Sequence, residues 1–177
     1  MKKFMAMLLA LAMVCALLAA CGGNTAPQET TAAPVVSVEG TMEELLNKVI
    51  EIQPVEFMGG TMPIDLTDEF ALTTYTGAAS AEGMIEGAFS ESMIGAQAYS
   101  LTLVKCESDE AAVALAQTMF DNIDTRKWVC VEATEKQAVA CGDLAFFVML
   151  NPEYGVTSDA IVEAFTAMFD SDYFILK

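Results

Sequence analysis

The apolar and polar positions divide the chain into three regions of different pattern. Residues 4–20 are apolar and carry no charge. Residues 24–40 are rich in Thr, Ala, Pro and Val and follow neither a helical nor a strand period, which is typical of a disordered tether. The rest of the chain, residues 41–177, alternates helical and strand periods over about 137 residues and has the size of one globular domain with a core.

Four segments of this domain combine a helix start signal with apolar residues at helical spacing. Thr41 and Glu44 form a capping box before the apolar face of Met42 to Ile52, and Pro54 ends that pattern. Gly77 is placed to end the second helix in the left-handed conformation. The predicted helices cover residues 41–53, 67–75, 108–124 and 157–169.

Four other segments have the features of strands, namely residues 85–90, 98–106, 128–132 and 137–150. The second alternates apolar and polar residues, so we expect one buried face. Residues 144–150 are apolar throughout, as in a central strand covered on both faces, and Gly142-Asp143 is expected to bulge or bend this segment. These elements predict an α+β fold, a two-layer sandwich with a mainly antiparallel sheet of about four strands and helices packed on one face.

The N-terminal segment has the organisation of a secretory signal peptide. Lys2 and Lys3 precede the apolar run, small residues precede Cys21, and two glycines follow it. The alternative is an uncleaved transmembrane helix, because 17 apolar residues reach the lower limit for crossing a bilayer. No basic stop-transfer cluster follows, so we expect cleavage after residue 20.

The tetrapeptide Leu18-Ala19-Ala20-Cys21 resembles the lipobox of bacterial lipoproteins. The resemblance implies that the Cys21 thiol takes a diacylglycerol and that Cys21 becomes the first residue of the mature chain. Two or more acyl chains make a stable membrane anchor. The expected organisation is a cleaved signal peptide over residues 1–20, a lipidated cysteine and flexible tether over 21–40, and a globular domain over 41–177 on the extracytoplasmic face of a cell membrane.

The domain is strongly acidic. The chain has 8 basic and 25 acidic residues and a formal charge of −17; removing residues 1–20 takes away two lysines and no acid, which leaves 6 basic residues and a charge of −19. Such a charge argues against binding to nucleic acid or lying flat on anionic lipid. A solubilising surface explains it more simply than a site for cations or basic partners.

Histidine is absent from the chain, which excludes Ser-His-Asp and Cys-His catalysis, histidine metal sites and histidine pH sensing. A Ser-Lys dyad remains open, although S-x-x-K is absent and the lysines are readable as residues of solvated faces or strand ends. Phosphate-binding glycine motifs are missing as well, and we expect no cofactor. Asp65, Asp68 and Glu69 lack the spacing of a calcium loop, and favourable interaction with a helix dipole explains the later two better than a metal site.

Three cysteines remain in the predicted mature domain: Cys106, Cys130 and Cys141. If Glu135-Lys136 formed a two-residue hairpin turn, Cys130 and Cys141 would face each other closely enough for a disulfide. The alternative, which we favour, is that these cysteines are small buried apolar residues. A redox enzyme is less favoured, because C-x-x-C is absent.

Arg126-Lys127-Trp128 is the densest basic and aromatic group in the chain. Arg126 and Trp128 are candidate contacts for an anionic or carboxylate ligand. The alternative is a helix-to-strand junction in which Trp128 begins a strand and Arg126 pairs with Asp121 or Asp124.

Several stretches of the domain resemble a family of uncharacterised lipoprotein domains from Gram-positive anaerobes. They are Tyr75-Thr76-Gly77, residues 98–105, the helix from Asp109, Arg126, and Ala140-Cys141-Gly142-Asp143. The resemblance implies a lipid-anchored extracytoplasmic location and brings no agreed activity or binding residues.

A non-enzymatic binding or surface-interaction domain is the function that these observations favour. Its expected partners are the membrane, through the lipid anchor, and an envelope protein, a cell-wall component or a small molecule. The alternative is a histidine-free, carboxylate-dependent hydrolase acting on cell-envelope material, although no pair of acids is singled out by spacing.

Overall fold

A computed structural model describes residues 39–56, 58–92, 95–169 and 171–177. The predicted signal peptide, Cys21 and the predicted tether before residue 39 lie outside these residues. In the described part of the chain, no helix is both long and apolar enough to cross a membrane.

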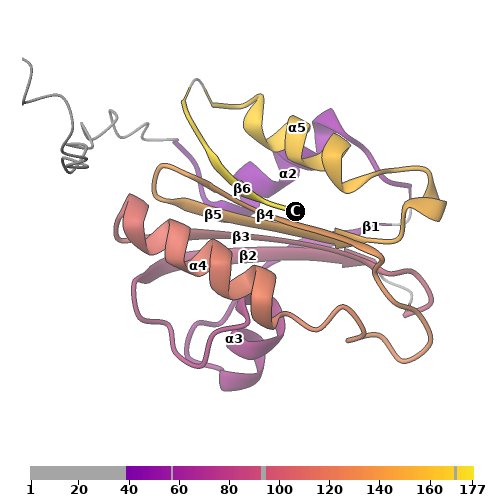
Figure 1. Cartoon of the computed structure of the whole chain (residues 1–177), viewed down its shortest axis with the longest axis horizontal. Helices are drawn as coiled ribbons and strands as arrows, with labels where there is room; N and C mark the ends of the chain where they lie inside the picture. Colours follow the sequence, from indigo (N-terminus) through magenta and orange to yellow (C-terminus); the bar gives the residue numbers. More distant parts are fainter. Residues whose placement is uncertain (1–38, 57, 93–94, 170) are drawn as a thin grey trace, which may run out of the picture. The chain divides into compact units, whose positions relative to one another are not determined.

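Six strands of the described residues form one antiparallel sheet in the order β1-β2-β3-β5-β4-β6 (Figure 1). The α+β class and the antiparallel sheet agree with the sequence prediction, whereas the expected number of about four strands is wrong. The strands are β1 Met58–Pro63, β2 Met84–Ser92, β3 Tyr99–Cys106, β4 Glu135–Cys141, β5 Leu144–Leu150 and β6 Phe174–Leu176.

The helices begin at the capping residues that the sequence indicates. At the first of them, Thr41 Oγ1 accepts from the Glu44 amide at 3.2 Å and the Glu44 carboxylate accepts from the Thr41 amide at 3.1 Å, which confirms the capping box. Ile52, expected on the buried face of this helix, is 54 % exposed. The helices are α2 Met42–Ile52, α3 Glu69–Thr76, α4 Asp109–Asn122 and α5 Ser158–Thr166, with a 3₁₀ helix at Pro152–Tyr154.

Helices cover both faces of the sheet, so the expected two-layer packing on one face is wrong. Helices α2 and α5 lie on one side, and α3 and α4 lie on the other (Figure 1). Leu101 and Leu103 of β3 pack in the core on the side of α2 and α5, while Val104 packs in the core on the side of α4. Ser100 and Thr102, expected on a solvated face, are also buried.

The long segment expected as one extended strand is a hairpin of β4 and β5. Gly142 has φ +55°, and Asp143 has no positive φ, as in the two-residue type II′ turn that suits the twist of paired strands. Cys141 pairs with Leu144 directly beside the turn. All seven residues of β5 are buried, so the prediction of a strand covered on both faces is confirmed.

Residues 128–132, expected to form a strand, are irregular. Ala133 N–H donates to Thr125 O at 2.9 Å and closes the segment into a loop. Both edges of β4 are already paired, one with β5 and the other with β6. Without a free edge nearby, the β-branched residues have no strand to join, and Val129 is 99 % exposed.

The two outer strands were not expected from the sequence. Strand β1 contains Gly59, Gly60 and Pro63, residue types that weaken a central strand but are tolerated at an edge. Strand β6 has three residues and pairs with Ala138 to Ala140 of β4. Both segments can be identified as strands only from their pairing, β1 with β2 and β6 with β4.

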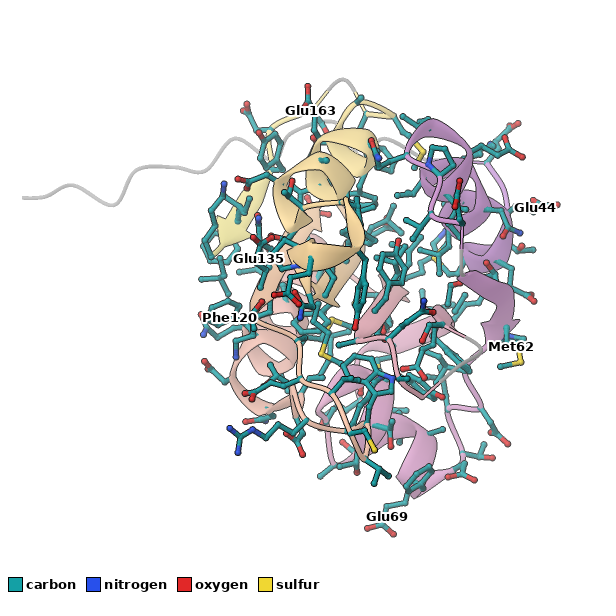
Figure 2. The ribbon with its side chains drawn as sticks, turned by 90° about the vertical axis from the view of Figure 1, so that its right-hand side faces the viewer. Glu44, Met62, Glu69, Phe120, Glu135 and Glu163 are labelled. Atoms are coloured by element: carbon teal, nitrogen blue, oxygen red, sulfur yellow. The ribbon has the colours of Figure 1, made fainter. Side chains whose placement is uncertain are left out.

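Acidic side chains project from helices on both sides of the sheet. Figure 2 shows Glu44 of α2, Glu69 of α3 and Glu163 of α5 pointing away from the core, and all three are exposed. This spread supports the interpretation of the charge as a solubilising surface.

Replacement of Phe146 by Ala tests the core between the sheet and α5. Phe146 is fully buried and stacks on Phe165 with ring centroids 4.4 Å apart. We expect Phe146→Ala to lower the free energy of unfolding by about 3–5 kcal/mol, because it leaves a cavity. Urea unfolding measures this. The matched control is Phe70→Ala on α3, where the ring is 76 % exposed and little change is expected; equal losses in both variants would contradict the assignment of the core.

Candidate functional site

An open groove of about 560 Å³ lies between α4 and the loop that joins α3 to β2. The loop runs from Gly77 to Gly83. Helix α4 contributes the small side chains of Ala111, Ala114 and Thr118. A volume of this size is within the range of pockets that hold small ligands.

Glycines allow the loop to lie close to α4 at both ends of the groove. Gly77 has φ +66°, and a Cβ there would lie 3.0 Å from the Cβ of Asn122. Asn122 Nδ2 also donates to Gly77 O at 3.1 Å. Gly83 has φ +76°, and a Cβ there would lie 3.4 Å from the Cβ of Ala111. The groove is therefore preformed, because its ends need both close approach and a backbone conformation that favours glycine.

The charged side chains that line the groove are Glu82 and Glu107. Both are exposed, and within the described residues neither is in an ion pair. The main-chain groups of Ala79 and Ser80 make no hydrogen bond with the described part of the chain. The groove thus combines small apolar surface, two free carboxylates and main-chain donors and acceptors.

A second cluster surrounds Lys127, the middle residue of the basic and aromatic group. Lys127 Nζ forms an ion pair with Glu91 and donates to Ser100 Oγ at 3.1 Å, and Ser100 Oγ donates to Glu91 at 3.0 Å. The ammonium lies 4.7 Å from the centre of the Tyr75 ring and 5.4 Å from that of the Trp128 ring. The Lys127 side chain is 13 % exposed. It is therefore a buried charge satisfied by an anion, a hydroxyl and two aromatic faces.

Burial changes the acidity of the groups in this cluster. It lowers the pKa of Lys127, and the nearby Glu91 carboxylate opposes that change. Burial together with the Glu91 charge raises the pKa of Tyr75 to about 12. Tyr75 also stacks on Phe89 of β2 with ring centroids 3.7 Å apart, which ties α3 to the sheet.

Ser100 and Lys127 have the residue types of a Ser-Lys dyad, a class that the sequence left open without naming a pair. The expectation that Lys127 belongs to a solvated face or strand end is wrong, because its side chain is buried. The two residues are 27 positions apart, and no local motif marks them. Ser100 is 1 % exposed and its hydroxyl proton is held by Glu91. In this arrangement the hydroxyl joins a buried charge network, and a substrate has no direct route to it.

Arg126 and Trp128, the predicted ligand contacts, line one shallow pocket of about 300 Å³, together with residues 129–132. Arg126 Nε pairs with a nearby acid, as the alternative interpretation expected, but this acid is Glu132, at 3.0 Å, and not Asp121 or Asp124, the two examples named from the sequence. The Asp124 carboxylate instead accepts from the Arg126 main-chain amide at 2.9 Å. The role of this loop in ligand binding stays a prediction.

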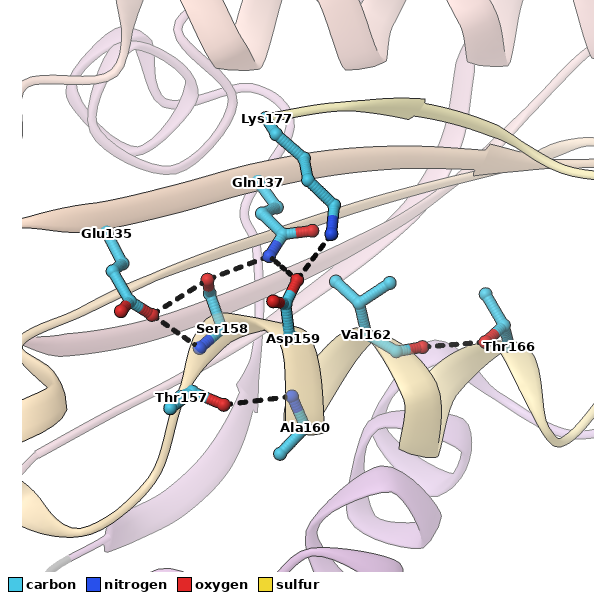
Figure 3. Close-up of polar contacts among 9 residues, drawn as sticks. All are labelled: Glu135, Gln137, Thr157, Ser158, Asp159, Ala160, Val162, Thr166 and Lys177. Atoms are coloured by element: carbon cyan, nitrogen blue, oxygen red, sulfur yellow. Dashed lines mark hydrogen bonds and ion pairs between the residues drawn. The ribbon is translucent and has the colours of Figure 1, made fainter.

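A third cluster joins β4, the start of α5 and the C-terminal Lys177 (Figure 3). Gln137 is 3 % exposed, and its Nε2 donates to Ser158 Oγ at 2.8 Å and to Asp159 Oδ1 at 2.7 Å. Glu135 accepts from the amide and the hydroxyl of Ser158 at 2.8 and 2.9 Å. Hydrogen bonds from Lys177 and Gln137 lower the pKa of Asp159. Each carboxylate is therefore engaged in attaching α5 to the sheet.

The three described cysteines are free thiols. The hairpin turn at Glu135-Lys136, on which a Cys130–Cys141 disulfide depended, is not formed, because these residues begin β4. Cys130 is exposed in the irregular loop and Cys141 is buried at the end of β4, so the register required for a disulfide is not formed. Burial raises the pKa of Cys106 to about 12 and also raises that of Cys141.

The acids near the start of α3 have local roles. Asp68 caps the helix by accepting from the Ala71 amide at 2.9 Å. Asp65 Oδ1 accepts from the amide and hydroxyl of Thr67. Over the described residues, no group of three or more acids or cysteines is arranged to hold a metal ion.

Comparisons with known proteins found no protein family, no curated protein and no solved structure that matches this chain. The resemblance to uncharacterised lipoprotein domains stays a prediction.

The ion pair of Lys127 and Glu91 can be tested by removing one partner or both. We expect Lys127→Met and Glu91→Gln each to lower the free energy of unfolding by about 3 kcal/mol, because each leaves a buried group without its partner. The double variant should lower the free energy of unfolding by less than the sum of the two single losses. Urea unfolding measures the cycle, and Lys177→Met, which removes an exposed ion pair, is the control. Strictly additive losses would show that the buried pair is not coupled.

Proposed function

We propose that the chain is a lipid-anchored, extracytoplasmic binding domain and that the groove between α4 and residues 77–83 is its recognition surface. The observation that carries the proposal is the preformed groove itself. Gly77 and Gly83 allow the loop to lie close to α4 at two points. The loop is therefore already in place, and a ligand that enters the groove does not need to order it.

The proposed anchor rests on the residue pattern around Cys21. The apolar segment follows Lys2 and Lys3 and ends in a tetrapeptide that resembles a lipobox. The residues after Cys21 have neither a helical nor a strand period, as expected of a tether. The anchor has a physical purpose, because anionic lipid repels a body of such negative charge. A covalent acyl anchor would keep the domain near the membrane against that repulsion.

A carboxylate-dependent hydrolase is the less supported function. It requires two acids that face a common opening with free oxygens. Glu135 and Asp159, which share polar partners, already accept hydrogen bonds from Ser158 and Gln137. The groove acids Glu82 and Glu107 are exposed to solvent, whereas a carboxylic general acid sits in an apolar pocket.

Replacement of Cys21 by Ser tests the anchor. We expect the wild-type chain, expressed in a bacterium with lipoprotein processing, to incorporate an alkyne-tagged palmitate and to stay with the membrane fraction. Cys21→Ser removes the acceptor thiol, so both properties should be lost. The control is Cys130→Ser, which should behave as the wild type; retention of label in Cys21→Ser would contradict the anchor.

Filling the groove tests the recognition surface. Ala114 lines the groove, whereas Val113 on the same helix is exposed outside it. We expect a ligand found by thermal-shift screening of wall peptides, glycans and short peptides to raise the Tm of the wild type and of Val113→Trp, but not of Ala114→Trp. The reason is that an indole at position 114 occupies the groove. A ligand shift that survives in Ala114→Trp would place the binding surface elsewhere.

A further inference from the structure

The two carboxylates in the groove have no basic partner, as is the case for most exposed acids among the described residues. Glu91, Glu132, Asp143 and Asp159 each have a lysine or arginine partner. Glu82 and Glu107 line the same groove and have no such partner among the described residues. The two residues are neighbours at one end of the groove, because the Glu107 amide donates to Gly83 O at 2.9 Å and Gly83 directly follows Glu82. They therefore place two uncompensated negative charges at the same end of the opening.

The loop beside these carboxylates offers the groups that a peptide backbone requires. The amide and carbonyl groups of Ala79 and Ser80 form no hydrogen bond with the described residues and belong to the groove wall. Opposite them, Ala111 and Ala114 leave space because their side chains are small. An extended segment can therefore bind the loop main chain while one of its side chains enters the groove.

From these observations we infer that the groove binds a cationic peptide, with a lysine or arginine side chain paired with Glu82 and Glu107. This inference rests on the proposed function and names the class of ligand. Charge complementarity supports it, because the groove is lined by two acids and no base and the chain carries −17. Anionic ligands are repelled by the same carboxylates, and a neutral ligand would leave both without partners.

The structure also distinguishes this ligand from a metal ion. A dedicated cation site needs several oxygen ligands converging on one point. In the described part of the chain, no set of three or more acids or cysteines is so arranged. An ammonium or guanidinium on a flexible stem can pair with two exposed carboxylates without such convergence.

Isothermal titration of the full-length chain in a non-ionic detergent tests the inference. The probe is an acetylated, amidated lysine-alanine-lysine tripeptide, and its matched control has norleucine in place of both lysines. We expect the lysine peptide alone to bind at about 0.15 M salt. The Kd should rise about three- to tenfold in Glu82→Gln/Glu107→Gln, because two exposed ion pairs are lost.

A second pair of substitutions separates the groove from the general acidity of the surface. Glu51→Gln/Glu163→Gln removes the same charge from α2 and α5, on the other side of the sheet. It should change the Kd by less than about twofold, since distant charges are screened. Equal weakening by both pairs would overturn the inference, as would displacement of the peptide by equimolar Ca²⁺. Circular dichroism and Tm establish that the variants are folded.

The outcomes also separate this inference from the proposed function. If the norleucine peptide binds as well as the lysine peptide and Ala114→Trp abolishes both, the groove binds peptides but the cationic requirement is wrong. If neither peptide binds, the inference fails. The proposed function fails as well only if the wider screen yields no ligand sensitive to Ala114→Trp.

Discussion

The pairing of β3 with β5 is the contact on which the other elements depend. Residues Leu101 to Val104 and all of β5 are buried, so neither strand has a face that water can cover. A sheet with such a centre needs apolar layers on both sides. Helices α2 and α5 supply one layer and α4 supplies most of the other, while the shorter strands β1 and β6 occupy the edges.

This arrangement explains where the candidate surfaces lie. Because helices cover both faces of the sheet, the groove forms on the outer side of one covering helix rather than on a strand. One side of α4 packs in the core through Ala112, Ala116 and Met119, and another side leaves Ala111 and Ala114 to line the groove. The four alanines of α4 allow both, because small side chains pack closely against the sheet and leave open space beside the loop.

The sequence predicted those elements whose signals are local. Capping residues such as Thr41, Ser108 and Thr157 mark helix starts, because a side chain that satisfies an orphan amide acts within three residues. The hairpin turn at Gly142-Asp143 also had a local signal, the glycine followed by aspartate, but the apolar residues on both sides made one long strand the simpler interpretation. Strand β6 had no adequate signal, because three residues become a strand only beside an open edge.

The candidate sites were predictable to different degrees. The basic and aromatic composition of Arg126-Lys127-Trp128 marked the segment that contains a buried charge. It did not show that Lys127 is the buried member, because Glu91 and Ser100 come from two strands distant in sequence. The groove was not predicted, because its glycines, alanines and acids form no local sequence motif. They line one opening only because the loop lies close to α4 in the folded chain.

The short connection between β4 and β5 affects how the chain can reach this structure. Loop closure costs least entropy when the partners are adjacent, and a two-residue turn joins these strands, whereas the pairing of β3 with β5 must enclose α4 and β4. We therefore expect the hairpin to form before the central pairing. The most apolar strand, β5, would be the segment most prone to aggregate while it is unpaired. Its partner β4 lies directly before it in the sequence, so we expect β5 to be unpaired only briefly.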